Sequence, residues 1–203
     1  MLKGLTETAP TDEITTYFTE IGRVCSSVSV SDGEGAPLDL AAGFDWIGEH
    51  ARKAHARGNK VILIGNGGSA AIASHEAIEF LKNGGVRALA LNDGATLTAI
   101  ANDLGYANVF AEQLRMHGQP GDLLIAISSS GQSTNILKAV EVARTRKVDV
   151  ATFSGFRPDN LLRSRGDVNF YVDSNQYGFV EIAHHALVQA ILDLNLIPKR
   201  QSE

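Results

Sequence analysis

Residues 61–69 read Val-Ile-Leu-Ile-Gly-Asn-Gly-Gly-Ser, an apolar run that passes directly into a glycine turn. A short apolar run that ends at a turn signal is typical of a buried strand, and the residues after this stretch are typical of a helix. A buried strand that leads through a glycine turn into a helix presents free backbone N–H groups, which α/β proteins use to hold phosphate. The stretch therefore predicts an α/β fold with an anion site at this turn.

A second segment of the same kind, residues 123–133, reads Leu-Leu-Ile-Ala-Ile-Ser-Ser-Ser-Gly-Gln-Ser. An ordinary helix N-cap needs one hydroxyl, whereas this turn supplies four, together with the free N–H groups of a helix start. Two strand ends with small hydroxyl side chains can hold one phosphate between them. We therefore expect residues 128–133 to form the more specific half of a single phosphate site.

The glycine turn does not match the nucleotide-binding motifs. Gly65-Asn66-Gly67-Gly68 lacks the spaced third glycine of a dinucleotide fingerprint, and no lysine follows the glycines as it does in a P-loop. The structural alternative is a tight strand-to-helix turn without a ligand, because glycine supplies the positive φ that such turns need. The sequence therefore predicts no nucleotide cofactor.

From residue 60 onward, predicted strands and helices alternate along the chain. The strands are short apolar runs without period-two alternation, as expected when helices cover both faces of a parallel sheet. We expect an α/β fold, a three-layer sandwich around a five-stranded parallel sheet, in which ligands bind at the carboxyl ends of the strands. The predicted strands are residues 60–64, 87–91, 122–127, 148–153 and 167–172. The predicted helices are residues 69–82, 96–103, 107–115, 132–145, 158–163 and 177–194.

Two further amphipathic helices, without residues that suggest chemistry, are predicted before these strands, at residues 11–25 and 39–57. We expect them to cover the sheet or to build an oligomer interface. Residues 26–37 have turn composition and predict a surface loop. The chain therefore divides into an N-terminal helix and loop, residues 1–38, and a main domain, residues 39–203.

Composition excludes several classes of protein. A chain of 203 residues with 44% hydrophobic content can bury one substantial core, and a net charge of -5 gives no basic field for direct nucleic-acid binding. The single cysteine, Cys25, excludes an internal disulfide and fits a reducing compartment. No apolar run approaches the roughly 18 residues of a membrane span, and the first residues lack the core of a signal peptide. We expect a cytoplasmic protein without membrane contact.

The helix that follows the glycine turn carries a histidine and a carboxylate. His75 and Glu79 are four residues apart and lie on one face, whereas Glu76 points about a quarter turn away from them. Such a pair is usually an exposed contact. Because this helix begins in the predicted phosphate loop, its second and third turns should flank a bound sugar, and we interpret the pair as acid–base groups.

The last predicted helix carries further candidates. Glu181, His185 and Gln189 fall within about 80° of one another and form one stripe. Adjacent histidines on a helix cannot face the same way, so we expect His184 to pack structurally. His185 then supplies a proton shuttle or completes a metal site, the alternative being that it faces solvent or an interface.

These motifs, in this order and spacing, resemble those of the SIS (sugar isomerase) domain family, and within it the phosphoheptose isomerases. The resemblance covers about residues 39–194. It implies a flavodoxin-like strand order, a homotetramer, and aldose–ketose isomerisation in heptose biosynthesis. This intramolecular oxidoreduction interconverts sedoheptulose 7-phosphate and D-glycero-D-manno-heptose 7-phosphate through an enediol. The motifs are Gly65-Asn66-Gly67-Gly68-Ser69, His75, Glu79, Asn102-Asp103-Leu104-Gly105-Tyr106, Ile127-Ser128-Ser129-Ser130-Gly131-Gln132-Ser133, Glu181 and His184.

The resemblance also implies how the substrate is bound. Asn66 and Asp103 would contact the sugar, and Gly67 belongs to the same substrate-binding turn. The residues that would bind the phosphate are Ser69, Ser128, Ser129, Ser130 and Ser133.

Catalytic and metal-binding roles follow from the same resemblance. Glu79 would move the proton between C1 and C2, and the other catalytic candidates are His75, His185 and Gln189. Family members can hold a divalent metal such as zinc, with residues that match His75, Glu79, Glu181 and Gln189.

Two positions depart from the family pattern. Glu181 stands where the isomerases commonly have glutamine, and Gln189 where they commonly have the second catalytic histidine. Glutamine cannot shuttle a proton, and the loss of one acid–base group lowers a rate by about a hundred- to ten-thousandfold. The added carboxylate instead strengthens a metal site. The rival hypotheses are a non-catalytic phosphosugar-binding or protein-binding SIS protein, of the kind that associates with the bacterial replication initiator, and an isomerase of another ketose phosphate.

Overall fold

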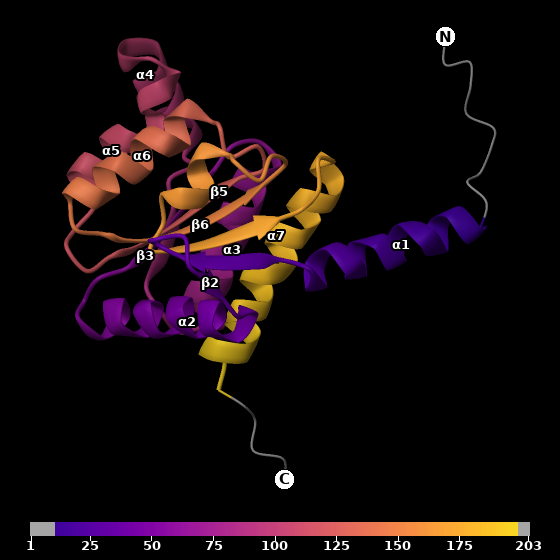
Figure 1. Ribbon diagram of the computed structural model, residues 1–203. Helices are drawn as coiled ribbons and strands as arrows, with labels where there is room; N and C mark the ends of the chain where they lie inside the picture. Colours follow the sequence, from indigo (N-terminus) through magenta and orange to yellow (C-terminus); the bar gives the residue numbers. More distant parts are fainter. Residues whose placement is uncertain (1–10, 199–203) are drawn as a thin grey trace.

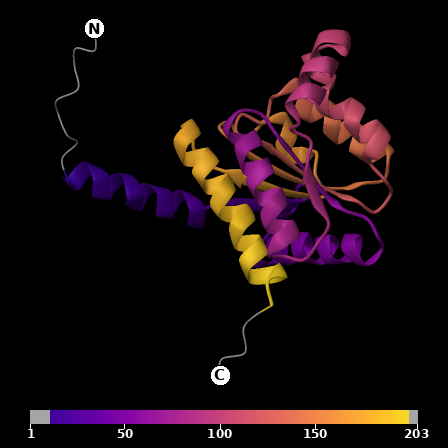
Figure 2. The same ribbon diagram turned by 180° about the vertical axis from the view of Figure 1, so that it is seen from behind.

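The computed structural model describes residues 11–198 and has the three-layer α/β architecture expected from the sequence (Figures 1 and 2). The strands are β1 (Ser29–Asp32), β2 (Pro37–Leu38), β3 (Val61–Gly65), β4 (Ala88–Ala90), β5 (Leu123–Ser128), β6 (Asp149–Gly155) and β7 (Val168–Val172). The α-helices are α1 (Thr11–Ser26), α2 (Leu40–Ala56), α3 (Gly68–Lys82), α4 (Gly94–Leu104), α5 (Val109–His117), α6 (Thr134–Thr145) and α7 (Tyr177–Ile191). The predicted helix at 158–163 is a 3-10 turn, Leu161–Ser164.

The central strands confirm the predicted five-stranded parallel sheet. The full sheet has the order β2-β1-β7-β6-β5-β3-β4, and the strands from β7 to β4 all pair in parallel. Counted along the chain, these five strands have the flavodoxin-like order 2-1-3-4-5. The order reverses between β3 and β5, so the carboxyl ends of these two strands form the topological switch point at which such sheets bind ligands.

The prediction of a surface loop at residues 26–37 is wrong, because this segment forms most of a hairpin. Val30 in β1 is buried and pairs antiparallel with Phe170 of β7, and β2 pairs with the outer edge of β1. Pairing with β7 satisfies backbone groups that a loop would leave to water, so a tertiary contact outweighs the turn composition. The division of the chain into two parts stays a prediction, and its ends at residues 1–10 and 199–203 lie outside the described residues.

Helices cover both faces of the sheet and build two apolar cores (Figure 1). On the face covered by α2, α3 and α7, Phe153 and Phe170 stack with ring centroids 4.7 Å apart. On the other face, α5 and α6 pack around Phe110. α1 extends away from the sheet and contacts α7 through Tyr17 and Phe179 (Figures 1 and 2). None of the helices in the described part of the chain combines the length and the apolarity that a bilayer crossing requires.

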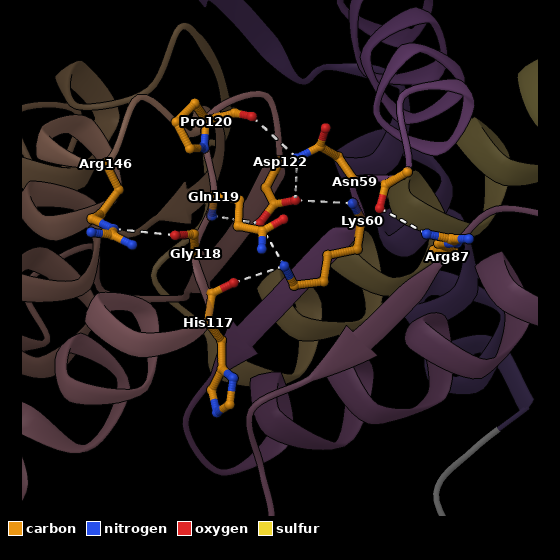
Figure 3. Close-up of polar contacts among 10 residues, drawn as sticks. Asn59, Lys60, Arg87, His117, Gly118, Gln119, Pro120, Asp122 and Arg146 are labelled. Atoms are coloured by element: carbon orange, nitrogen blue, oxygen red, sulfur yellow. Dashed lines mark hydrogen bonds and ion pairs between the residues drawn. The ribbon is translucent and has the colours of Figure 1, made fainter.

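A buried ion pair joins the chain segments at the amino ends of β3 and β5, opposite the switch point (Figure 3). The fully buried Asp122 carboxylate accepts hydrogen bonds from Lys60 Nζ at 2.7 Å, from the Lys60 N–H at 3.0 Å and from the Gln119 N–H at 2.8 Å. The Asn59 amide donates a further bond of 3.1 Å. This network holds the start of β5, the strand whose far end carries the serine loop.

Candidate functional site

A cavity of about 120 Å³ lies at the switch point, where β3, β5 and the start of α7 meet. Asn66 and every serine predicted to bind phosphate line this cavity, together with Tyr177 and Glu181. The structure therefore brings together the glycine turn and the serine loop, which are far apart in the sequence. We call this space the serine cavity.

The serine loop has the geometry of an anion site. Its backbone turns at Gly131, which has φ +63°, and an added Cβ there would overlap Oδ1 of Asn160. Ser128 Oγ donates to Ser133 Oγ at 3.3 Å, whereas the buried hydroxyl of Ser129 has no hydrogen-bond partner among the described residues. α6 begins directly after the loop, and a helix start favours a nearby anion. A phosphate in the cavity would meet free hydroxyl and N–H donors.

The glycine turn closes the other side of the cavity. Gly67 has φ +56°, a conformation that favours glycine, and it leads directly into α3. A Cβ on Gly68 would overlap the carboxylate of Glu181 in α7. The absence of a side chain at Gly68 is therefore what allows α7 to place a carboxylate against the first turn of α3. This arrangement adds a negative charge to the wall of the cavity.

Asn66 is held in place by Asn135, which sequence reasoning missed, and by Tyr106. It exchanges two hydrogen bonds of 2.9 Å with the buried Asn135 of α6. Its Oδ1 accepts a third, of 3.0 Å, from the Tyr106 hydroxyl. No local pattern marks a helical asparagine as the partner of a distant loop, whereas Tyr106 closes a motif that the resemblance had already singled out. Both residues orient the Asn66 amide at the edge of the cavity.

Asp103, which we expected to contact the sugar, does not line the serine cavity. It is exposed on α4 and accepts a 2.8 Å hydrogen bond from the adjacent Asn102. Its role in sugar binding stays a prediction.

Replacing both Ser130 and Ser133 by Ala should remove most of the thermal stabilisation that phosphate gives the protein. The two hydroxyls would donate charge-assisted hydrogen bonds to phosphate oxygens, and a ligand at a hundred times its Kd adds about 2.7 kcal/mol of stability. The measurement is the melting temperature with and without phosphate, with Ser164→Ala on the exposed 3-10 turn as the matched control. An unchanged phosphate-induced shift in the double variant would contradict the assignment of the cavity.

A second group of polar side chains lies further along α3 and α7. His75 and Glu76 from α3 and His185 from α7 have ligand atoms that all lie within 4.8 Å of one another. His185 Nε2 is 3.1 Å from Glu76 Oε1, and the His75 and His185 rings meet edge to face with centroids 5.1 Å apart. Two imidazoles and a carboxylate at this spacing could hold a metal ion. We call these three residues the His–Glu–His cluster.

Glu76 is the residue that sequence reasoning misplaced. The expectation that it points away from His75 is wrong, because its side chain is fully buried and lies within the cluster. Burial raises the pKa of Glu76 to about 8, and the charges of Glu79 and Asp193 add to the effect. Helical periodicity gives the angle between residues of α3, but it does not say which face α7 covers.

Two other predicted residues form hydrogen bonds near the ends of their helices. Glu79 accepts a hydrogen bond from the Asn83 amide. Gln189 donates a 2.8 Å bond to Asp193. The catalytic roles inferred for Glu79 and Gln189 stay predictions.

The four residues that the resemblance implies for zinc do not form one ligand group in this structure. Of the four, His75 alone belongs to the cluster, and Glu181 lies in the serine cavity instead. Among the described histidines, cysteines and carboxylates, the group with metal-ligand spacing is completed by Glu76 and His185. The donors of the cluster therefore fit a metal ion, and the metal-binding role of the four residues that the resemblance implies stays a prediction.

His184 packs structurally, as the sequence predicts. It is fully buried, its Nε2 lies 3.1 Å from the carbonyl oxygen of Ser154, and its ring meets Phe153 edge to face. Burial lowers the pKa of His184 to about 4, so the ring is neutral at pH 7. The neighbouring His185 has 45% of its side chain exposed and faces the cluster.

The chain is similar to known proteins over most of its length. The model of the SIS domain family matches residues 17–155. A phosphoheptose isomerase of Thermodesulfovibrio yellowstonii is 39% identical over 154 residues, which cover 73% of this chain and 76% of that protein. One of Thiobacillus denitrificans is 41% identical over 146 residues, or 68% and 74% of the two proteins. The structure of phosphoheptose isomerase from Neisseria gonorrhoeae has a TM-score of 0.77 and 31% identity, covering 90% of this chain and 97% of that one.

Proposed function

The chain belongs to the SIS domain family, and from that membership we propose that it is an isomerase that interconverts sedoheptulose 7-phosphate and D-glycero-D-manno-heptose 7-phosphate. One observation carries this proposal. The serine cavity supplies donors for a phosphate, and α3, which begins at that cavity, carries a histidine and two carboxylates in its next turns. The names and the 39–41% identity of the curated relatives support the seven-carbon substrate.

In the proposed reaction, the serines hold the phosphate while acid–base groups act at the other end of the sugar. Glu79 removes a proton from C1 of the ketose, the electron pair forms the C1–C2 double bond of an enediol, and the C2 oxygen takes up a proton. Glu79 then returns its proton to C2 while O1 loses a proton, which gives the aldose. Because Gln189 has no ionisable group, we assign the oxygen-bound proton to His75 or His185 in the protein without a bound metal.

Hydrogen exchange tests this proposal without assuming a product. The protein is incubated with sedoheptulose 7-phosphate in deuterated water, and NMR follows deuterium at C1. We expect deuterium at C1 and the appearance of the aldose. Bound sugar phosphate without any exchange would contradict isomerisation.

A second candidate function is a phosphosugar-binding protein without catalysis, of the kind that associates with the replication initiator. The observation that favours it is the amide at Gln189, which donates to Asp193 and cannot shuttle a proton. If this hypothesis holds, the parent shows no exchange and Gln189→His gains it. Activity in the parent would exclude it.

We further propose that the chain works in the cytoplasm as a homotetramer in heptose biosynthesis. In support of assembly, α1 extends from the body with Ile14, Tyr17 and Phe18 exposed by 48%, 45% and 66% (Figure 1). Side chains of this kind favour burial against another surface. Light scattering measures the molar mass, and a monomer at micromolar concentration would contradict this assembly.

A further inference from the structure

We propose that His75, Glu76 and His185 bind one divalent transition-metal ion, at a site different from the one that the family resemblance implies. The site combines neighbouring residues of α3 with one residue of α7. The proposal goes beyond the isomerase function and does not depend on it.

The three ligand atoms of the His–Glu–His cluster lie near enough to surround one ion after small side-chain movements. All three ligand atoms lie within 4.8 Å of one another, and His185 Nε2 is 3.1 Å from Glu76 Oε1. In a tetrahedral zinc site with bonds of about 2.0–2.1 Å, neighbouring donor atoms are about 3.3 Å apart. Small movements of the exposed His75 ring would therefore suffice to place all three donors around an ion.

The hydrogen bonding of Glu76 gives the independent argument. Both carboxylate oxygens are buried without a hydrogen-bond partner among the described residues, although His185 Nε2 approaches one of them. His185 Nε2 and Glu76 Oε1, both possible metal ligands, are therefore 3.1 Å apart without a well-aligned hydrogen bond between them. Buried carboxyl groups in proteins are hydrogen-bonded, paired or bound to metals, because an unsatisfied buried polar group is costly. A bound cation would supply the missing partner.

The surrounding charges also favour a cation. The negative charges of Glu79 and Asp193 act on the carboxyl of Glu76 and help to raise its pKa. No lysine or arginine in the described part of the chain lies within ion-pair distance of Glu76. A divalent ion would offset this accumulation of negative charge.

The donor set indicates the class of metal. Two imidazoles and one carboxylate suit zinc, cobalt and nickel better than magnesium or calcium, which prefer all-oxygen sites. His75 and His185 are accessible from solvent, so a three-ligand site would leave a position open for water or substrate.

Titration of the metal alone tests the site in the full-length chain. Metal is first removed with a chelator, and Zn²⁺ is then added in a calorimeter without any sugar. We expect one tight site in the parent chain and at least a hundredfold weaker binding in Glu76→Gln and in His185→Ala. Glu79→Gln is the matched control, because it removes only a neighbouring charge on the same helix and should weaken binding far less than Glu76→Gln does. Co²⁺ gives a second readout, since its visible absorption reports tetrahedral nitrogen and oxygen ligation.

The control variant also decides between the two possible ligand sets. Loss of binding in Glu79→Gln with parent-like binding in Glu76→Gln would overturn the proposal in favour of the residues implied by the resemblance. Absence of tight Zn²⁺ binding in the parent would overturn it as well. Without metal, Glu76→Gln should melt close to the parent at pH 7, because burial keeps the parent carboxyl protonated and the amide replaces one neutral buried group by another of the same size. His185→Ala, at a half-exposed position, keeps the test valid if the buried substitution does not fold. Because no sugar is present, failure of the isomerase proposal would leave this result unchanged.

Discussion

Replacing Glu79 by Gln is expected to lower deuterium exchange at C1 of sedoheptulose 7-phosphate at least a hundredfold, without changing the stabilisation by phosphate. The amide keeps the size of the side chain but cannot accept the C1 proton, and a positioned general base contributes about a factor of a hundred to ten thousand. Phosphate binding uses the serine cavity, which Glu79 does not line. The expected change is therefore in the rate and not in the phosphate-induced melting shift.

Two other carboxylates make this test specific. Glu49→Gln removes an exposed carboxylate from α2, paired with Lys53, and should exchange at the parent rate. Glu76→Gln removes the buried carboxylate that lies closest to the histidines. Parent-like exchange in Glu79→Gln together with a large loss in Glu76→Gln would contradict the assignment of Glu79 as the base.

The order of helices and strands was predictable from the sequence because both faces of the parallel sheet are covered. Each buried strand is then a continuous apolar run, and each helix has its own periodicity. The β1–β2 hairpin was not predictable in this way. Its Ser- and Gly-rich residues become strands because β7 offers an unpaired edge, and such an edge is a property of the folded sheet.

The residues of the candidate site likewise fall into those that the sequence predicts and those that depend on tertiary packing. The serine cavity could be expected, because its residues follow two strands that end at the same switch point. The partners of Asn66 and the burial of Glu76 depend on how α6 and α7 pack against other elements. Sequence periodicity orients residues within one helix, and it contains no information about the neighbour that covers a given face. Spacing alone therefore does not choose between candidate ligands on neighbouring faces of one helix, such as Glu76 and Glu79 of α3.

A large loss of stability is expected when the Asp122 network, at the end of the sheet opposite the cavity, is broken. Asp122→Ala should lower the free energy of unfolding by about 3–5 kcal/mol, as the loss of one partner from a buried ion pair does. The Lys60 ammonium would remain mostly buried without its carboxylate, and the backbone N–H groups of Lys60 and Gln119 would lose their acceptor. Urea unfolding measures the change.

Two control variants show whether the effect is specific to the buried network. One tests an exposed ion pair, and the other tests whether the serine cavity stays intact. Asp159→Ala breaks an ion pair with Arg157 in which both side chains are largely exposed, and solvent screening should leave stability nearly unchanged. Asp122→Asn keeps one acceptor oxygen, so it should be less damaging than Asp122→Ala. Because Asp122 precedes β5 and the serine loop follows it, Asp122→Asn should retain the full phosphate-induced melting shift. An Asp122→Ala protein as stable as Asp159→Ala would mean that the buried network contributes nothing to stability, and that the register of β5 is held by its neighbours β3 and β6 alone.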